Sequence, residues 1–324
     1  MILASLLPPI AGFVATLMGA ALLLWAIAIV LMANARLRPP RMTDGKALFV
    51  LGRISPADLS LPYETDVFEI AEGVEGVDAP GRRKLLLHAW WIPHSGARGR
   101  CVILLHGYAD ARPGALAWLP MLHDLQINVL MLDQRAHGQS AGVHCTAGYY
   151  ERQDLWQVID QLRKERPSDA QAIAIFGISM GGVTAIAVGA MRDDLAGIIA
   201  DSPFGDYTTA GMLHADLFGF PGWFVQRPAA WLAQRLTGAR YGAVSPLRLV
   251  PQLRVPLLLI QPSQDRVISP DDAAQLRQQL TDNPLVGHRS RAVIIPGAAH
   301  VLGLGASPEF YETEVSNFLR EILP

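Results

Sequence analysis

The chain has 324 residues, of which 51% are hydrophobic and 17% charged, and its formal net charge is −2. This length suits one large α/β domain or two small ones. No Lys/Arg-rich block interleaves with aromatic residues, so nucleic acid is not expected as a partner. The two cysteines, Cys101 and Cys145, do not have the spacing of a metal site, and no cofactor or metal is expected. Cys101 opens an apolar run and is expected in the core, while a disulfide between the two stays open.

An uncharged apolar run over residues 10–33 follows a short N-terminal tail, residues 1–9. A membrane-spanning helix needs about 20 predominantly apolar residues, and this run provides them. The alternative is a cleaved signal peptide, with Ala33-Asn34-Ala35 as the cleavage site. The run is longer than the roughly 7–15 residues of a signal-peptide core, and no basic residue precedes it. We therefore expect a retained transmembrane helix.

Basic residues gather directly after this run, at Arg36, Arg38, Arg41 and Lys46, whereas none precedes it. The positive-inside rule then places the C-terminal domain in the cytoplasm, with the chain attached to the membrane through its N-terminal helix. Residues 34–55 are predicted to form a juxtamembrane linker, because Pro39-Pro40 mark the exit from the helix. The folded domain is expected over residues 56–324.

Short apolar runs alternate with segments of helical spacing throughout this domain. The loop over residues 72–81 is rich in Gly, Pro and Asp and is predicted to be a hairpin turn between the first two strands. The alternation predicts an α/β fold with a doubly wound, mostly parallel sheet. Strands are expected at residues 66–70, 85–92, 101–105, 128–133, 171–176, 197–201, 255–260 and 291–295, and helices at 154–164, 183–190, 271–280 and 309–323.

Residues 205–254 interrupt the alternation with aromatic residues set between helix-breaking prolines and glycines. Two interpretations stay open for this insertion. It forms an acyl-binding cap over the sheet, since ligand pockets are mostly apolar, or it forms helices that merely pack on the sheet. The aromatic residues are Tyr207, Phe218, Phe220, Trp223, Phe224, Trp231 and Tyr241.

A Gly-x-Ser-x-Gly motif, Gly177 to Gly181, lies between a predicted buried strand and an Ala-rich segment that suits a helix. The motif alone is weak, but strand, sharp turn and helix are the context in which it presents a nucleophilic serine. The glycines are needed because the turn is strained and the strand and helix pass closely. Ser179 is therefore the candidate nucleophile.

Asp265 and His300 each follow the carboxyl end of a later predicted strand, as Ser179 does. Ligands bind at that edge of an open α/β sheet. A serine hydroxyl needs an adjacent base, which His300 supplies, and an ionised Asp265 fixes the histidine tautomer. The developing oxyanion needs backbone donors, for which the N–H groups of Met180 and Tyr108 are the candidates.

Several motifs occur together along residues 56–324, and with them the chain resembles serine hydrolases of the α/β-hydrolase superfamily. Within that superfamily it is similar to the membrane-anchored branch related to acyl-protein thioesterases and monoacylglycerol lipases. The resemblance implies that Ser179 is the nucleophile, Asp265 the acid, His300 the base, and Tyr108 and Met180 the oxyanion donors. The motifs are His106-Gly107-Tyr108, Leu132-Asp-Gln-Arg-Ala-His-Gly-Gln-Ser140, Gly148-Tyr-Tyr-Glu-Arg-Gln-Asp154, Gly177-Ile-Ser-Met-Gly-Gly182, Asp201-Ser-Pro-Phe204 and Ala299-His300.

The residues before Asp265 depart from this pattern. Related hydrolases often have a glycine two or three residues before the acid, where this chain reads Gln261-Pro262-Ser263-Gln264. Some relatives use an acid after the preceding strand, which here is Asp201, so Asp201 remains the rival acid.

Other histidines and acids are given structural roles. His106 is expected to brace the oxyanion loop, and His137 and Asp133 to brace the 133–140 loop. His288 is the rival base, but it precedes the last predicted strand and falls at the wrong edge of the sheet.

The expected activity is hydrolysis of carboxylic esters or thioesters through an acyl-enzyme, with a small-molecule acyl compound, a lipid or an acylated protein as substrate. The alternatives are acyl transfer to an acceptor other than water, peptide cleavage by the same residues, or a non-catalytic membrane-anchored binding module. By resemblance, enzymes of this fold that act on haloalkanes or epoxides use an aspartate as the nucleophile. The serine at position 179, Ser179, therefore disfavours that chemistry.

Overall fold

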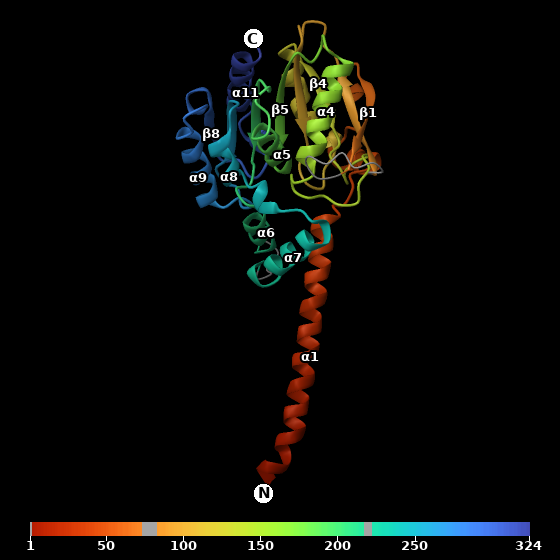
Figure 1. Ribbon diagram of the computed structural model, residues 1–324, viewed down its shortest axis with the longest axis vertical. Helices are drawn as coiled ribbons and strands as arrows, with labels where there is room; N and C mark the ends of the chain where they lie inside the picture. Colours follow the sequence, from red (N-terminus) through yellow and green to blue (C-terminus); the bar gives the residue numbers. More distant parts are fainter. Residues whose placement is uncertain (1, 73–82, 217–221) are drawn as a thin grey trace.

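The computed structural model describes residues 2–72, 83–216 and 222–324 (Figure 1). The strands are β1 (Glu64–Ala71), β2 (Lys84–Ile92), β3 (Arg100–Leu105), β4 (Asn128–Leu132), β5 (Ala172–Ile178), β6 (Gly197–Asp201), β7 (Leu257–Pro262) and β8 (Arg291–Ile295). The α-helices are α1 (Ile2–Leu37), α2 (Asp44–Leu51), α3 (Leu119–Asp124), α4 (Glu151–Glu165), α5 (Met180–Gly189), α6 (Tyr207–Asp216), α7 (Gly222–Thr237), α8 (Pro246–Leu249), α9 (Pro270–Thr281), α10 (Gly303–Ala306) and α11 (Pro308–Ile322).

Within the described residues, the eight strands form one sheet in the order β1-β2-β4-β3-β5-β6-β7-β8. The pairs β1/β2 and β2/β4 are antiparallel, and every pair from β4/β3 to β7/β8 is parallel. The prediction of a doubly wound, mostly parallel sheet is confirmed. The loop predicted as a hairpin turn lies, apart from residue 72, outside the described residues, although β1 and β2 pair as the two arms of a hairpin do.

Helices cover both faces of the sheet, and β5 at its centre is buried on both sides. Ile173 and Ile175 belong to a cluster that includes α4, α5 and α9, whereas Ala174 and Phe176 belong to one that includes α3 and α11. Successive strand residues point to opposite faces, so an unbroken apolar run is what a doubly covered strand needs. This explains why the central strands can be predicted from the sequence.

Helix α1 has 36 residues and projects from the domain, with the N-terminus at its far end (Figure 1). It is long and apolar enough, between Ala11 and Leu37, to cross a bilayer. Its last turns are not free, because Ala33 and Leu37 are buried in a hydrophobic cluster that includes residues of α5 and α7. The helix therefore continues into the segment predicted as linker and packs there against the domain.

That predicted linker also contains α2, which begins after Thr43 and ends at Gly52. The Thr43 side chain accepts a hydrogen bond from the Lys46 N–H, and Gly52 adopts φ 67°, a left-handed helix ending that glycine favours. Helix α2 is not among the predicted helices, and neither is the helical stretch over Arg112–Asp124, which lies between β3 and β4.

The insertion after β6 holds α6, α7 and α8, and its first two helices lie below the sheet beside the upper part of α1 (Figure 1). Its aromatic residues divide into two groups. Tyr207 and Tyr241 pack edge to face at 4.6 Å, beside the buried core cluster. Trp223, Phe224 and Trp231 are exposed on α7. Phe218 and Phe220 lie outside the described residues.

Candidate active site

Ser179 occupies a strained turn between β5 and α5. Its φ of 52° and ψ of −113° lie in a region that non-glycine residues rarely adopt. A Cβ on Gly177 would approach the Gly181 carbonyl oxygen to 2.1 Å, and one on Gly181 would approach the Leu105 carbonyl oxygen to 2.6 Å. Both glycines are therefore required by the close passage of strand and helix, and the turn lifts the serine above the carboxyl edge of the sheet.

The structure brings Ser179, His300 and Asp265 into one hydrogen-bonded chain. Ser179 Oγ lies 2.9 Å from His300 Nε2, and His300 Nδ1 lies 2.7 Å from Asp265 Oδ2. The second carboxylate oxygen of Asp265 accepts the N–H groups of Val267 (2.8 Å) and Ile268 (3.1 Å). With Nδ1–H donated to the carboxylate, Nε2 is left as an acceptor for the serine proton, which is the geometry that general-base catalysis requires.

Asp201, the rival acid, lies nearby but has other partners. Its carboxylate accepts the hydroxyl groups of Tyr311 (2.6 Å) and Ser202 (2.7 Å), and it is fully buried at the end of β6. Burial raises the pKa of Asp201 above its usual range. The Asp265 carboxylate, not that of Asp201, is hydrogen-bonded to His300.

The loop after β3 adjoins the serine. A Cβ on Gly107 would lie 3.5 Å from Ser179 Cβ, so the loop passes close to the nucleophile at Gly107, the residue before Tyr108. On the other side, Met180 begins α5, and the first N–H groups of a helix have no intrahelical acceptor. The two predicted oxyanion donors thus belong to the two segments that flank Ser179.

Two buried histidines brace this loop. His106 Nε2 accepts the Gln134 N–H at 3.0 Å, with its Nδ1 against the Gly107 carbonyl at 2.7 Å. His137 Nε2 accepts the Ala109 N–H at 3.1 Å, with its Nδ1 against the Arg135 carbonyl at 2.8 Å. Both rings are therefore neutral Nδ1–H tautomers that tie the oxyanion loop to the 133–140 loop.

Because these two histidine rings are buried and neutral, we expect the free energy of unfolding to fall at acid pH. Burial lowers the pKa of His106 to about 4 and that of His137 to about 3, whereas both titrate near 6.5 in an unfolded chain. Between pH 6.5 and 4 the unfolded state binds more protons, so the contribution of these rings to the free energy of unfolding falls as pH falls, by about 3 kcal/mol for His106. Urea unfolding at a series of pH values measures this slope. His106→Gln is expected to flatten it, while His288→Gln, at an exposed site, leaves it unchanged; equal slopes in the two variants would contradict the assignment.

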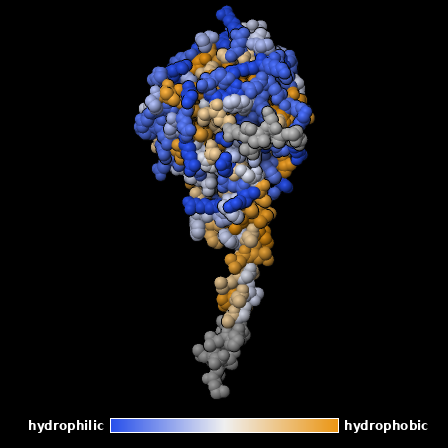
Figure 2. Space-filling model, in the orientation of Figure 1, coloured by the Kyte–Doolittle hydropathy of each residue, from blue (hydrophilic) through white to orange (hydrophobic). Residues whose placement is uncertain are grey.

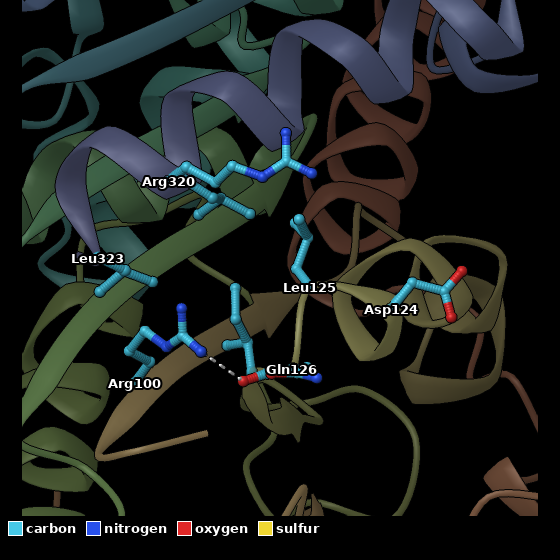
Figure 3. Close-up of a pocket in the computed structure, with 8 residues that line it drawn as sticks. Arg100, Asp124, Leu125, Gln126, Arg320 and Leu323 are labelled. Carbon is cyan, nitrogen blue, oxygen red and sulfur yellow. Dashed lines mark hydrogen bonds between the residues drawn. The ribbon is translucent and has the colours of Figure 1, made fainter. Parts of the chain in front are cut away.

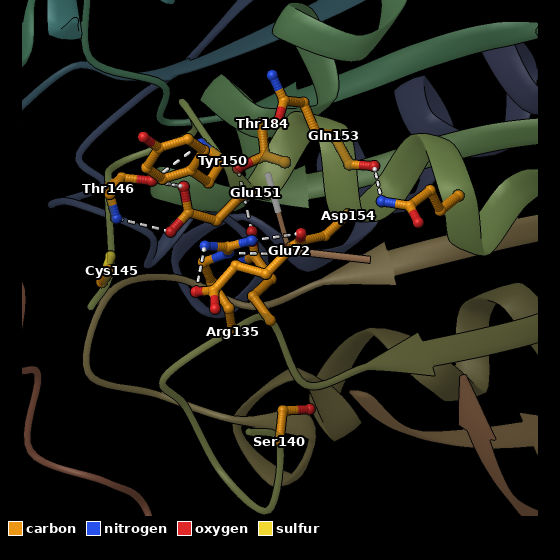
Figure 4. Close-up of polar contacts among 12 residues, drawn as sticks. Glu72, Arg135, Ser140, Cys145, Thr146, Tyr150, Glu151, Gln153, Asp154 and Thr184 are labelled. Atoms are coloured by element: carbon orange, nitrogen blue, oxygen red, sulfur yellow. Dashed lines mark hydrogen bonds and ion pairs between the residues drawn. The ribbon is translucent and has the colours of Figure 1, made fainter. Parts of the chain in front are cut away.

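A buried ion pair fixes the 133–140 loop from beneath. Figure 4 shows the Arg135 guanidinium between Asp154 and Glu72. Its Nε and Nη2 each donate to an Asp154 oxygen at 2.5 Å, and its Nη1 lies 3.8 Å from Glu72. Two-point pairing of this kind holds the geometry of both partners. Because the Arg135 carbonyl also orients His137, the ion pair joins two of the sequence motifs to the oxyanion loop.

The end of α1 contacts the same loops, which the sequence did not indicate. The Tyr108 hydroxyl donates to the Ala35 carbonyl, and the Cys145 N–H donates to the Leu37 carbonyl at 2.8 Å. Cys101 and Cys145 are free and buried. The segment that leaves the predicted membrane span is thus part of the wall of the candidate site.

Arg41 strengthens this contact, because its side chain binds the carbonyl groups of the 137–142 turn. Its guanidinium donates to His137 (3.3 Å), Gly138 (2.8 Å), Ser140 (2.7 Å) and Gly142 (3.1 Å). The Arg41 side chain therefore holds the turn that carries His137, the residue whose ring accepts the Ala109 N–H of the oxyanion loop.

We expect Arg41→Ala to lower the free energy of unfolding by about 1–2 kcal/mol, because four carbonyl groups lose a charged donor on a half-exposed surface. The matched control is Arg38→Ala, since the Arg38 side chain makes no hydrogen bond or ion pair with another described residue. Chemical denaturation in detergent micelles measures both. An equal loss in the two variants would show that the Arg41 bonds do not stabilise the turn.

His288 and a cavity lie at the other edge of the sheet. His288 belongs to the turn Gly287–Arg289 that precedes β8. The cavity has a volume of about 300 Å³ and lies at the amino ends of β3 and β4, and Figure 3 shows side chains that line it. It is lined by Arg100, Asp124, Leu125, Gln126, Ile127, Leu319, Arg320 and Leu323.

Within residues 2–72, 83–216 and 222–324, no group of three or more His, Cys, Asp or Glu side chains is placed to hold a metal ion.

Comparisons with known proteins agree with this fold. The family model described as serine aminopeptidase, S33, matches residues 96–241. The chain is 34% identical over 182 residues to the uncharacterized protein YqkD of Bacillus subtilis, a match that covers 55% of this chain and 59% of that protein. It is 26% identical over 256 residues to the uncharacterized protein YfhR of Salmonella typhi, covering 73% and 78% of the two chains.

Among solved structures, the esterase Pf2001 of Pyrococcus furiosus superposes with a TM-score of 0.69 at 25% identity, covering 89% of this chain and all of that one. A mostly parallel sheet, a serine at the turn after its central strand, and matches to hydrolases over the same region all agree. The chain therefore has the α/β-hydrolase fold, and these similarities support a hydrolase of that type.

Proposed function

We propose that this hydrolase is a membrane-anchored serine hydrolase that cleaves carboxylic esters or thioesters through an acyl-enzyme on Ser179. The observation that carries the proposal is the hydrogen-bonded chain from Ser179 Oγ through His300 to Asp265, at 2.9 and 2.7 Å. A serine, a base and an orienting carboxylate in this geometry form the constellation that activates a hydroxyl for acyl transfer.

The reaction proceeds in two balanced halves. His300 Nε2 takes the Ser179 proton as Oγ bonds to the substrate carbonyl carbon, and the N–H groups of Tyr108 and Met180 receive the negative charge on the carbonyl oxygen. The bond to the leaving alcohol or thiol breaks, and the imidazolium returns the proton to it. Water then attacks the acyl-enzyme with His300 again as base, which releases the carboxylic acid and restores Ser179.

Labelling with a fluorophosphonate probe tests the nucleophile directly. We expect the probe to attach to the wild-type chain, with the added mass on the tryptic peptide that contains Ser179. The label is expected to disappear when the protein is heat-denatured first, because the hydroxyl is reactive only beside His300. A label on another serine, or none on the folded protein, would refute the proposal.

A second candidate is peptide cleavage, which the description of the matching family model favours. Ester and amide substrates with the same acyl group separate the two. An esterase releases p-nitrophenol from acyl esters much faster than p-nitroaniline from aminoacyl anilides, and a peptidase reverses that order for an unblocked N-terminal residue. Added alcohols or amines that divert the acyl group would indicate acyl transfer instead.

The membrane attachment rests on α1 and on the residues around its end. Ala33 would be lost or become terminal if a leader were cleaved near residue 35, yet it is buried beside the domain core, which supports a retained helix. The basic residues after α1 favour a cytoplasmic domain. Protease protection of sealed vesicles or reporter fusions at the C-terminus test this; a domain on the outer side would overturn the orientation.

A further inference from the structure

The exposed face of cap helix α7 alternates large aromatic and basic side chains. Trp223, Arg227, Trp231 and Arg235 follow one another at four-residue spacing and therefore share one face of the helix. All four are exposed, the two tryptophans at 67% and 57%. Two indoles of this exposure on one helix are unusual for a surface in contact with water alone.

The other face of α7 is packed on α1. The Trp25 indole N–H donates to the Phe224 carbonyl at 3.0 Å, and the two rings lie 5.2 Å apart. Farther along, the buried Arg36 guanidinium donates twice to Gln226 Oε1, at 2.8 and 2.6 Å. Ala229 belongs to the same buried cluster as the end of α1. The cap helix is thus held firmly alongside the predicted membrane span.

The position of Trp25 sets the depth of α7. It lies eight residues before Ala33, the last residue of the uncharged run, which corresponds to roughly 12 Å at 1.5 Å per helical residue. A bilayer that begins anywhere near Ala33 therefore reaches the start of α7, because Phe224 is bonded to Trp25. Figure 2 shows the apolar surface of α1 continuing to the base of the domain, where apolar and charged side chains lie side by side.

We propose that α7 lies in the membrane interface beside α1, with its tryptophans among the upper acyl chains and Arg227 and Arg235 against lipid phosphates. Trp and Arg are the residues that suit this zone, since indoles anchor at the headgroup level and basic side chains bind anionic lipids. The inference rests on the proposed membrane-anchored hydrolase. Met180 and residues of α7 belong to one buried cluster, so α7 packs close to the turn that carries Ser179.

A fluorescent label reports where α7 lies. Cys101 and Cys145 are buried, so a thiol-reactive NBD dye attaches to an introduced cysteine at Trp223→Cys or, as a matched exposed control at the opposite edge of the sheet, Leu285→Cys (67% and 56% exposed). The full chain is placed in vesicles of phosphatidylcholine and phosphatidylglycerol that contain a lipid with a nitroxide near its headgroup. We expect quenching by about twofold or more at position 223 and little at 285.

Equal quenching at the two positions would overturn the inference, and Trp231→Cys repeats the test if Trp223→Cys does not fold. A dye that is shielded without quenching, and becomes exposed as protein is diluted in the vesicles, would mean that a second copy covers this face, which also overturns it. Fluorophosphonate labelling is measured on the same vesicles. A reactive Ser179 with an unquenched position 223 leaves the hydrolase intact and refutes only the membrane contact.

Discussion

Replacing Ser179 by alanine is expected to lower kcat for a short acyl ester by about 10⁵- to 10⁶-fold, with no loss of folded protein. The substitution removes the atom that forms the acyl bond and that is hydrogen-bonded to His300 Nε2. Alanine and serine tolerate a φ of 52° about equally, so the turn itself is not further strained. Hydrolysis of a p-nitrophenyl ester in detergent micelles, beside a thermal melt, gives both quantities.

Ser263→Ala is the matched control for this loss. Ser263 also follows the carboxyl end of a strand, β7, but it is exposed and accepts only the Gly297 N–H, at 2.8 Å. Its kcat should stay within about twofold of wild type, because a single exposed hydrogen bond contributes little. A Ser179→Ala protein that retained a tenth of the wild-type rate would rule out an acyl-enzyme on Ser179.

The strands from β3 to β7 are predictable because they are buried on both faces, whereas the edge strand β8 is partly exposed. The runs at residues 101–105, 197–201 and 291–295 coincide with β3, β6 and β8 to within one residue. A parallel strand that is covered on both faces has an unbroken run of apolar residues in the sequence. The end of that run also indicates where the strand ends. Candidate residues just beyond those ends are therefore predicted from the sequence to lie at one edge of the sheet.

The contacts of α1 were not predictable in the same way. A helix that is apolar all round carries no pattern that marks which turns pack on protein and which face lipid. The sequence predicts that Arg36 is a membrane-flanking charge, whereas its side chain is buried against Gln226 and lies over the Tyr207 ring. Helix α2 was predictable in principle, since Thr43 and Gly52 are recognisable start and stop signals around eight residues.

The choice between two acids shows the limit of the sequence at the site. Asp201 and Asp265 lie at the carboxyl ends of two neighbouring parallel strands, so their positions in the sequence do not distinguish them. Only the family resemblance favours Asp265 as the acid. The structure separates them by hydrogen bonding, because Asp201 is occupied by Tyr311, which in turn accepts the Trp118 indole N–H at 2.8 Å. That partner comes from α11, far along the chain, and no local pattern announces it.

The Asp265→Asn variant is expected to lose about 10⁴-fold in kcat. Oδ1 of Asp265 accepts the N–H groups of Val267 and Ile268, so an asparagine keeps its carbonyl oxygen there. Its amide NH₂ then takes the place of Oδ2 and donates to His300 Nδ1. The ring is forced into the opposite tautomer, with the proton on Nε2, and it can no longer accept the proton of Ser179.

Asp201→Asn provides the contrast, because it changes the same atoms in a carboxylate that does not contact His300. An asparagine there retains an acceptor for the Tyr311 hydroxyl, so kcat should fall less than about tenfold, with a change in stability of about 1–2 kcal/mol. The two variants are compared by kcat and by thermal melts under identical conditions. Ser179 in Asp265→Asn should also react far more slowly with the fluorophosphonate, whereas Asp201→Asn should label almost as fast as wild type. The reverse order would transfer the role of the acid to Asp201 and require His300 to turn toward β6 during the reaction.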